Sequence, residues 1–300
     1  MTPREGDPRA AGMRLGIVTP VLTRLPRAHA HWEAEAGIVE VERLVVGAER
    51  LGYDFATCSE HVAIPQDVAA TRGATYWDPL PTFGYLAART TTIRLATFVL
   101  VLGYHHPLAI AKRYGTLDRI CGGRLVLGVG VGSLEEEFAL LGAPFAGRGE
   151  QGDDAMRALR AAFGDPTPRY EGSHYRFEGF VVDPCGVQRD VPLWVGGRSG
   201  RSLRRAVGLA DGWAPFALRP DEVAGLLDTA RDTEAWARRS APLEVVLQPA
   251  PPLDPIGAPG PTQETLDTHR HAGATALALR FRHRSPDHYL EQLEALQALV

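Results

Sequence analysis

Eight short apolar segments recur along the chain, and a stretch with apolar residues at helical spacing follows each of them. Glycine, proline or aspartate bounds the segments, a pattern typical of strands buried in a parallel sheet. The expected strands cover residues 14–20, 55–61, 93–100, 124–131, 192–197, 212–216, 243–249 and 276–281. The expected helices cover residues 38–52, 79–90, 107–120, 134–141, 150–164, 199–210, 220–238, 262–272 and 286–299. With 134–141 and 150–164 taken together after the fourth strand, eight alternating strand and helix units predict an α/β fold, the (β/α)8 or TIM barrel.

A doubly wound sheet is the structural alternative, but that fold usually has fewer strands and a glycine-rich loop after the first one. Here the first strand ends in Thr19-Pro20 without such a loop. Residues 165–191 alternate apolar and polar positions, which predicts a hairpin insertion into the barrel. Residues 1–12 are polar, so we expect a disordered leader followed by a single barrel domain over residues 13–300.

The composition excludes several classes of protein. The formal net charge is −4, which argues against a nucleic-acid partner because such domains are normally basic. Three widely spaced cysteines form neither a disulfide framework nor a zinc motif, so no metal is expected. No apolar run reaches the length that spans a membrane, and residues 1–12 lack the apolar core of a signal peptide. We therefore expect a cytoplasmic protein with a small-molecule substrate.

Active sites of (β/α)8 barrels lie at the C-terminal ends of the strands, and two of these ends carry glycine-rich loops. In the first, Gly196 and Gly197 precede Arg198 and Ser199 at the expected start of a helix, which predicts a phosphate site. A flexible turn with a basic helix face is the structural alternative. In the second, Gly130 and Gly132 precede Ser133, and close packing of helix on strand explains these glycines equally well. Ser133 and Glu136 also have the spacing of a capping box.

Side chains at other strand ends complete the candidate site. His61 ends the second strand and is a candidate for proton transfer, with Glu60 as a neighbour able to set its tautomer. A loop histidine bonded to a neighbour is the alternative. Trp213 and Arg280, at the ends of two later strands, are candidates for substrate binding. A salt bridge to a barrel carboxylate would explain Arg280 as well.

Several motifs together resemble the bacterial luciferase-like monooxygenase superfamily, especially the branch that uses the deazaflavin coenzyme F420. The matching pieces are GAERLGYDFATCSEHV at 47–62, HPLAIAK at 106–112, TLDRICGGRLVLGVGVG at 116–132, EEEF after it and PLWVGGRSGRSLRRAVGLADGW at 192–213. The resemblance implies a (β/α)8 barrel that binds a flavin or deazaflavin, and a homodimer. It assigns the cofactor phosphate to Gly196, Gly197, Arg198 and Ser199. It also assigns His61 to the reactive face of the cofactor.

The resemblance further implies that Thr97, Phe98 and Val99 lie against the cofactor ring, with a cis peptide between Phe98 and Val99. Two positions depart from the family pattern. Ser133 replaces a tryptophan or glutamate, and Pro65 replaces the tryptophan that follows the histidine in the sugar-phosphate dehydrogenases. Oxidation of glucose 6-phosphate is therefore disfavoured, and the substrate stays open.

The cofactor decides between two activities, because a deazaflavin carries hydride whereas a reduced flavin also reacts with oxygen. Lys112 is the only lysine and asparagine is absent, which indicates a GC-rich genome and favours coenzyme F420 by association. The first hypothesis is an F420-dependent oxidoreductase. The second is an FMN-dependent monooxygenase supplied by a separate reductase. A non-catalytic flavin-binding barrel is the third.

Overall fold

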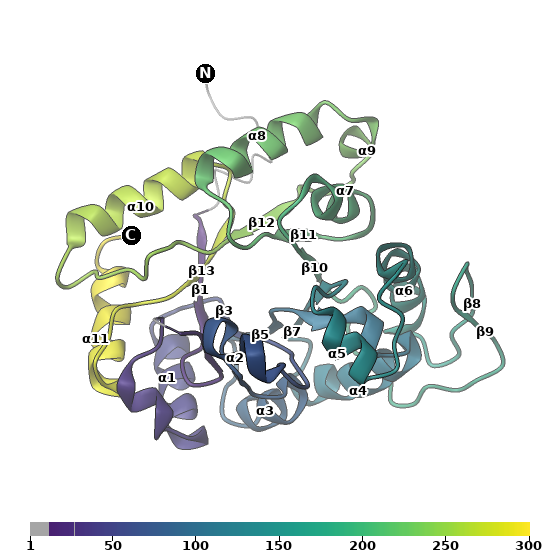
Figure 1. The fold of residues 1–300 in the computed structure, drawn as a ribbon, viewed down its shortest axis with the longest axis horizontal. Helices are drawn as coiled ribbons and strands as arrows, with labels where there is room; N and C mark the ends of the chain where they lie inside the picture. Colours follow the sequence, from purple (N-terminus) through teal and green to yellow (C-terminus); the bar gives the residue numbers. More distant parts are fainter. Residues whose placement is uncertain (1–11, 27) are drawn as a thin grey trace. The chain divides into compact units, whose positions relative to one another are not determined.

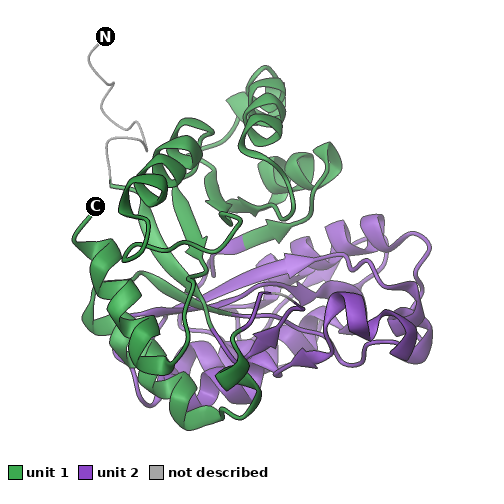
Figure 2. Ribbon diagram, turned by 60° about the vertical axis from the view of Figure 1, so that its left-hand side comes forward, with its two compact units in different colours: residues 1–19, 30–57, 194–300 green, residues 20–29, 58–193 purple. Residues whose placement is uncertain are grey.

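The structure is a computed structural model that describes residues 12–26 and 28–300. The leader expected over residues 1–12 lies outside the described residues except for Gly12. The chain divides into two compact units, shown in different colours in Figure 2. Unit 1 comprises residues 1–19, 30–57 and 194–300, and unit 2 comprises residues 20–29 and 58–193. Each unit consists of several separate segments of the chain, so no single linker in the sequence marks the boundary between them.

Unit 1 contains parallel strands in the order β10-β11-β12-β13-β1-β3. Helices α1 and α11 lie side by side in this unit (Figure 1). Its elements are β1 (Arg14–Val18), η1 (His31–Ala34), α1 (Ile38–Arg50), β3 (Phe55–Cys58), β10 (Leu193–Gly196), α7 (Gly200–Leu209), β11 (Gly212–Ala214), α8 (Pro220–Arg231), α9 (Glu234–Ala237), β12 (Glu244–Leu247), α10 (Pro259–His271), β13 (Ala276–Leu279) and α11 (Pro286–Gln297).

Unit 2 contains β7 with two parallel neighbours, β5 and β6. Two short antiparallel pairs, β2 with β4 and β8 with β9, lie outside that sheet. Its elements are β2 (Thr23–Arg24), α2 (Gln66–Arg72), β4 (Thr75–Tyr76), α3 (Pro79–Ala87), β5 (Arg94–Thr97), β6 (Leu100–Val101), η2 (Leu102–Tyr104), α4 (Pro107–Ile120), β7 (Leu125–Gly130), α5 (Glu135–Leu140), α6 (Arg148–Ala162), β8 (Tyr170–Glu171) and β9 (Arg176–Phe177).

The eight predicted strands are all present, as β1, β3, β5, β7, β10, β11, β12 and β13, and a helix follows each of them. The fold class is that of the (β/α)8 barrel, as predicted. The strands are almost entirely buried, which explains why apolar runs rather than alternating patterns mark them in the sequence. Each ends one to three residues before its apolar run does, and the remaining residues begin the loops.

The hairpin predicted within residues 165–191 is present as the pair β8 and β9. A buried aspartate on α6 holds it: Asp154 accepts hydrogen bonds from the Tyr170 hydroxyl at 2.6 Å and from the His174 and Tyr175 N–H groups at 2.8 and 2.9 Å. Further along, the backbone N–H groups of Val187 and Gln188 donate to buried Asp118 of α4. Two carboxylates therefore fix an insertion that has little regular structure.

Three structural absences concern the described residues. No helix there has the length and apolar character needed to cross a membrane. No group of histidine, cysteine, aspartate and glutamate side chains in the same residues has the arrangement of a metal site. Cys58, Cys121 and Cys185 are free and buried.

Candidate active site

His61 pairs with a glutamate from another element of unit 2. Its Nδ1 lies 2.7 Å from Oε2 of Glu137, in the first turn of α5. The Glu137 side chain has no exposed surface. Its other oxygen accepts hydrogen bonds from the backbone N–H groups of Val62 at 2.6 Å and Ala63 at 3.2 Å. One carboxylate thus fixes both the imidazole and the loop that carries it.

The electrostatics of Glu137 determine which nitrogen of His61 is protonated. Burial alone would raise the pKa of Glu137, but hydrogen bonds from His61, Tyr104 and the Val62 N–H outweigh it and lower the pKa. The ionised carboxylate can only accept, so Nδ1 of His61 carries the proton. Nε2 has no hydrogen-bond partner among the described residues. The imidazole can therefore accept or donate a proton at Nε2.

Two tyrosines surround this pair. The ring of Tyr76 packs edge-on against His61, with ring centres 4.5 Å apart. The Tyr104 hydroxyl donates to Glu137 Oε2 at 2.8 Å. Burial, and then the neighbouring carboxylate, raise the pKa of Tyr104, so its hydroxyl stays protonated. His61 keeps 18% of its side-chain surface exposed, enough for contact with a bound molecule.

Glu60 does not act on His61, so that prediction is wrong. Its Oε1 lies 2.6 Å from Nε2 of His105, and its Oε2 accepts a hydrogen bond from the Val101 N–H at 2.7 Å. Successive side chains of an extended chain point to opposite sides, which separates Glu60 from His61. Glu137, and not Glu60, is the carboxylate that fixes the tautomer of His61.

The peptide bond between Phe98 and Val99 is cis, at the predicted position. The chain that precedes His61 holds it from both sides. The Phe98 N–H donates to the Cys58 carbonyl at 2.7 Å, and the Ser59 hydroxyl donates to the Phe98 carbonyl at 2.8 Å. Phe98 and Val99 are half-buried. The Phe98–Val99 segment is hydrogen-bonded to the chain just before His61, so this segment and His61 belong to one local arrangement.

Thr97 and Gly130 support this segment by close packing. Thr97 is fully buried, and its hydroxyl donates to the Gly128 carbonyl at 2.7 Å. A Cβ at Gly130 would lie 2.8 Å from a Val99 methyl, and one at Gly128 would lie 1.9 Å from the Thr97 carbonyl oxygen. The alternating glycines therefore let two strands approach closely. Thr97 holds the segment in place and offers no exposed side chain to a cofactor.

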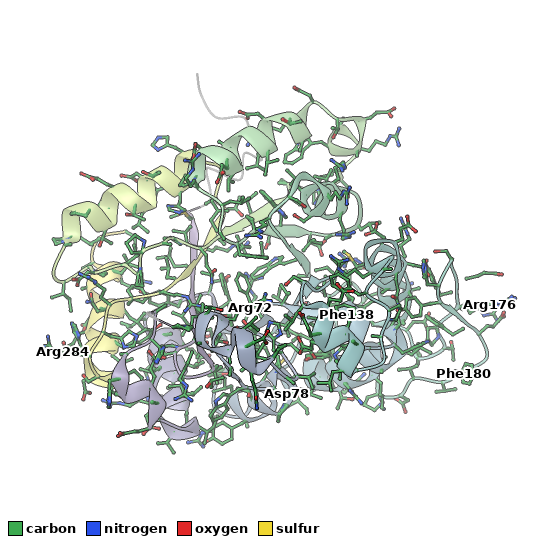
Figure 3. The ribbon with its side chains drawn as sticks, viewed as in Figure 1. Arg72, Asp78, Phe138, Arg176, Phe180 and Arg284 are labelled. Carbon is green, nitrogen blue, oxygen red and sulfur yellow. The ribbon has the colours of Figure 1, made fainter. Side chains whose placement is uncertain are left out.

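Ser133 contacts an arginine instead of capping a helix. Helix α5 begins at Glu135 with Leu134 as its N-cap residue, so the predicted capping box is wrong. The Arg72 guanidinium, from the end of α2, donates to the Ser133 hydroxyl at 3.1 Å. Gly132 has φ +78° and packs against Phe138, where a Cβ would lie 2.4 Å from the ring. Figure 3 labels Arg72 and Phe138.

Unit 1 contains the other glycine-rich loop, with Gly196 and Gly197, between β10 and α7. Gly197 has φ +131°, and a Cβ there would lie 2.7 Å from Cβ of Ser202. The Ser199 N–H donates to the Ser202 hydroxyl at 3.3 Å, which orders the start of the helix. Arg198 and Ser199 are exposed, whereas Gly196 is half-buried. The turn thus combines a close backbone, an exposed arginine and the N-terminus of a ten-residue helix.

Trp213 lies beneath this turn. Its side chain is fully buried, and its indole N–H donates to the Ser202 hydroxyl at 3.2 Å. The predicted contact with substrate is therefore wrong, because the ring has no exposed surface. Arg280 follows β13 and is half-buried, and its carbonyl accepts a hydrogen bond from the Leu253 N–H at 2.8 Å. A substrate role for Arg280 stays a prediction.

Sequence reasoning missed Glu137. The run Glu135-Glu136-Glu137 looks like negative charge at a helix N-terminus, where the helix dipole favours it. Glu137 nevertheless shares a helix face with Leu134, Phe138 and Leu141, at the spacing of a buried stripe. An acidic residue on an apolar face is the signal that distinguishes it from its two exposed neighbours.

Three comparisons place the chain among known proteins. An uncharacterized protein of Mycobacterium tuberculosis is 31% identical over 214 residues, covering 67% of this chain and 74% of that protein. An F420-dependent glucose-6-phosphate dehydrogenase of Microbacterium testaceum is 30% identical over 169 residues, covering 55% of this chain and 49% of the relative. The crystal structure of the monooxygenase RslO1 from Streptomyces bottropensis shares the fold, with a TM-score of 0.78 at 19% identity over 96% of this chain and 98% of that one.

The family model for luciferase-like monooxygenases matches residues 13–255. That match covers most of the described chain and includes every site residue considered above except Arg280. The chain belongs to the luciferase-like monooxygenase family, whose members are oxidoreductases.

Proposed function

We propose that this protein transfers hydride between coenzyme F420 and a small organic substrate. The observation that carries the proposal is the pair of His61 and Glu137, which leaves Nε2 available for a proton. Reduction of a carbonyl or oxidation of an alcohol moves one proton along with the hydride. An imidazole with a fixed tautomer suits that step, and general acid–base groups typically contribute about 10²–10⁴-fold in rate.

The residues of unit 1 fit a cofactor that carries a phosphate. Gly197 has φ +131°, and a Cβ there would meet the Ser202 side chain, so the shape of this turn before the helix requires glycine. The N-terminus of α7 and the exposed Arg198 favour negative charge at the same turn. We assign the cofactor phosphate to Gly196, Gly197, Arg198 and Ser199.

The half-buried Phe98 and Val99 would offer apolar contact to a cofactor ring. When bound, the deazaflavin supplies the hydride chemistry itself. The protein supplies the position of the ring and the proton at His61. Glu137 keeps Nδ1 protonated throughout, so Nε2 is the only nitrogen that exchanges a proton with substrate.

The relative named as an F420-dependent dehydrogenase supports the deazaflavin over FMN. An FMN-dependent monooxygenase fed by a separate reductase is the competing function, since the same turn would accept the phosphate of FMN. Pro65 stands where the sugar-phosphate dehydrogenases have tryptophan, so we propose a substrate other than glucose 6-phosphate.

Titration of the purified protein with F420 and with FMN tests the proposal, followed by absorbance-monitored turnover of a panel of alcohols and carbonyl compounds. Binding of F420 with hydride transfer supports it. Preference for FMN with oxygen consumption selects the monooxygenase, and absence of binding to either cofactor contradicts both.

We also propose a cytoplasmic location and a homodimer. The dimer is supported by exposed apolar side chains on the two helices whose sequences are unusually apolar. Val39 on α1 is 68% exposed and Tyr85 on α3 is 38% exposed. An interface between two copies would cover these side chains, as interfaces cover large apolar patches.

A further inference from the structure

Arg72 of unit 2 has an unusual position for an arginine. It is half-buried, and within residues 12–26 and 28–300 the only side chain bonded to its guanidinium is the neutral Ser133 hydroxyl at 3.1 Å. No carboxylate among the described residues forms an ion pair with it. A guanidinium has five N–H donors in a planar fork that matches a carboxylate in two-point contact. Most of that donor capacity is unused.

The surroundings of Arg72 connect it with His61. The Tyr76 hydroxyl donates to the Arg72 carbonyl at 3.3 Å, and the same Tyr76 ring packs against the His61 imidazole. The positive charge of Arg72 also opposes the rise in the pKa of Tyr104, whose hydroxyl binds Glu137. Arg72 therefore acts electrostatically on Tyr104, which donates a hydrogen bond to the carboxylate of Glu137.

The acidic groups nearest in sequence do not neutralise Arg72. Asp67 on α2 and the exposed Glu135 and Glu136 on α5 form no ion pair with it. Glu137 is occupied by His61, Tyr104 and two backbone N–H groups. The charge on Arg72 thus stays available to a molecule bound beside His61.

We propose that Arg72 and Ser133 form a subsite for a carboxylate group of the organic substrate. The guanidinium fork binds the carboxylate oxygens, and Ser133 holds the arginine in place. The substrate is then an alcohol or carbonyl compound that also carries a carboxylate. This reading of the substrate rests on the proposed function, whereas the anion site itself does not.

Binding of benzoate to the 300-residue protein without cofactor tests the subsite, measured by ligand-observed NMR at constant ionic strength. Benzamide has nearly the same shape without the charge. We expect benzoate to bind the wild-type protein at least tenfold more tightly than benzamide. Arg72→Gln should lose that preference, whereas Arg72→Lys should keep part of it. Arg169→Gln, which removes an exposed arginine from an ion pair with Glu178, should leave binding unchanged.

Three results would overturn the subsite. They are equal affinity for benzoate and benzamide, benzoate binding that survives Arg72→Gln, or benzoate binding lost in Arg198→Gln but not in Arg72→Gln. Tighter competition by inorganic phosphate than by benzoate would overturn the choice of a carboxylate. Thermal unfolding of each variant checks that it is folded. These measurements use no cofactor, so their failure is distinguishable from failure of the proposed hydride transfer, which the cofactor titration reports.

Discussion

His61 is the residue on which the proposed chemistry depends. We expect His61→Ala to keep the fold and the bound cofactor but to lose about a hundredfold or more in turnover, because Nε2 of His61 carries the proton in the proposed step. Steady-state rates with saturating cofactor measure this. His271→Ala, an exposed histidine on α10, is the control. If the variant instead binds cofactor poorly while the bound fraction turns over normally, His61 is a positioning residue.

Glu137 ties the stability of unit 2 to pH. Folding lowers its pKa from an ordinary value near 4.5, so the ionised form stabilises the fold above that value and this contribution is lost as the pH falls through the folded pKa. Glu137→Gln should reduce the free energy of unfolding at pH 7 by about 1–3 kcal/mol. The difference between wild type and variant should shrink below pH 4.5. Urea unfolding from pH 7 to pH 3 measures it, and a difference that stays constant in acid would contradict the assignment.

The sequence predicts individual residues less well than it predicts elements. The cis peptide at Phe98 is confirmed, because motif pieces mark its position, whereas the role of His61 at a strand end stays a prediction. The partner of His61 was not predicted, because Glu137 lies 76 positions away and only the fold brings it to the imidazole. The substrate role of Trp213 was predicted from its place near the end of a strand. The sequence does not show that the turn between β10 and α7 covers the Trp213 ring, which is fully buried.

Among the elements, the turn between β10 and α7 carries the cofactor prediction. We expect Gly197→Asp to weaken cofactor binding at least tenfold, or about 1.4 kcal/mol, because it adds a carboxylate at the proposed phosphate site and a Cβ that would lie 2.7 Å from that of Ser202. Gly208→Asp places the same charge on α7 where a Cβ meets nothing within 4 Å, and serves as control. Unchanged cofactor affinity in a folded Gly197→Asp protein would reject the phosphate assignment.

The hairpin β8–β9 depends on one carboxylate of α6. Asp154→Asn replaces an acceptor oxygen with a donor that faces the N–H groups of His174 and Tyr175, so we expect a loss of about 1.5–3 kcal/mol. Faster amide hydrogen exchange across residues 170–177 should accompany it. Glu150→Gln changes an exposed carboxylate on the same helix and should have little effect. Unaltered exchange in Asp154→Asn would show that the hairpin is held by other contacts.

Long periodic elements were predictable, whereas of the two-residue strands only the hairpin pair β8–β9 was expected. Helix α4 begins and ends where its apolar spacing and the flanking proline and glycines predict. The two-residue strands β2 and β4 and the seven-residue α2 went unpredicted, because segments this short have no measurable period. This matters for the site, since Arg72 and Tyr76 come from those unpredicted elements.

For the whole molecule, the proposed homodimer is tested by its mass in solution. We expect twice the chain mass of 32.5 kDa by light scattering at micromolar concentration. Val39→Asp on α1 should favour the monomer, because it places a charge on an exposed apolar position. A monomeric mass for the wild-type protein would reject the dimer.

The fold class follows from the sequence because eight buried strands repeat with helices between them, and that pattern has few alternatives. The cofactor does not follow, because a turn that accepts one phosphate accepts either candidate. Titration of the cofactor-free protein with F420 and with FMN, monitored by absorbance, therefore tests the central claim most directly. We predict tighter binding of F420, with reduction or oxidation of the bound coenzyme on addition of an alcohol or carbonyl substrate. Exclusive binding of FMN, or binding of neither cofactor, would contradict the claim.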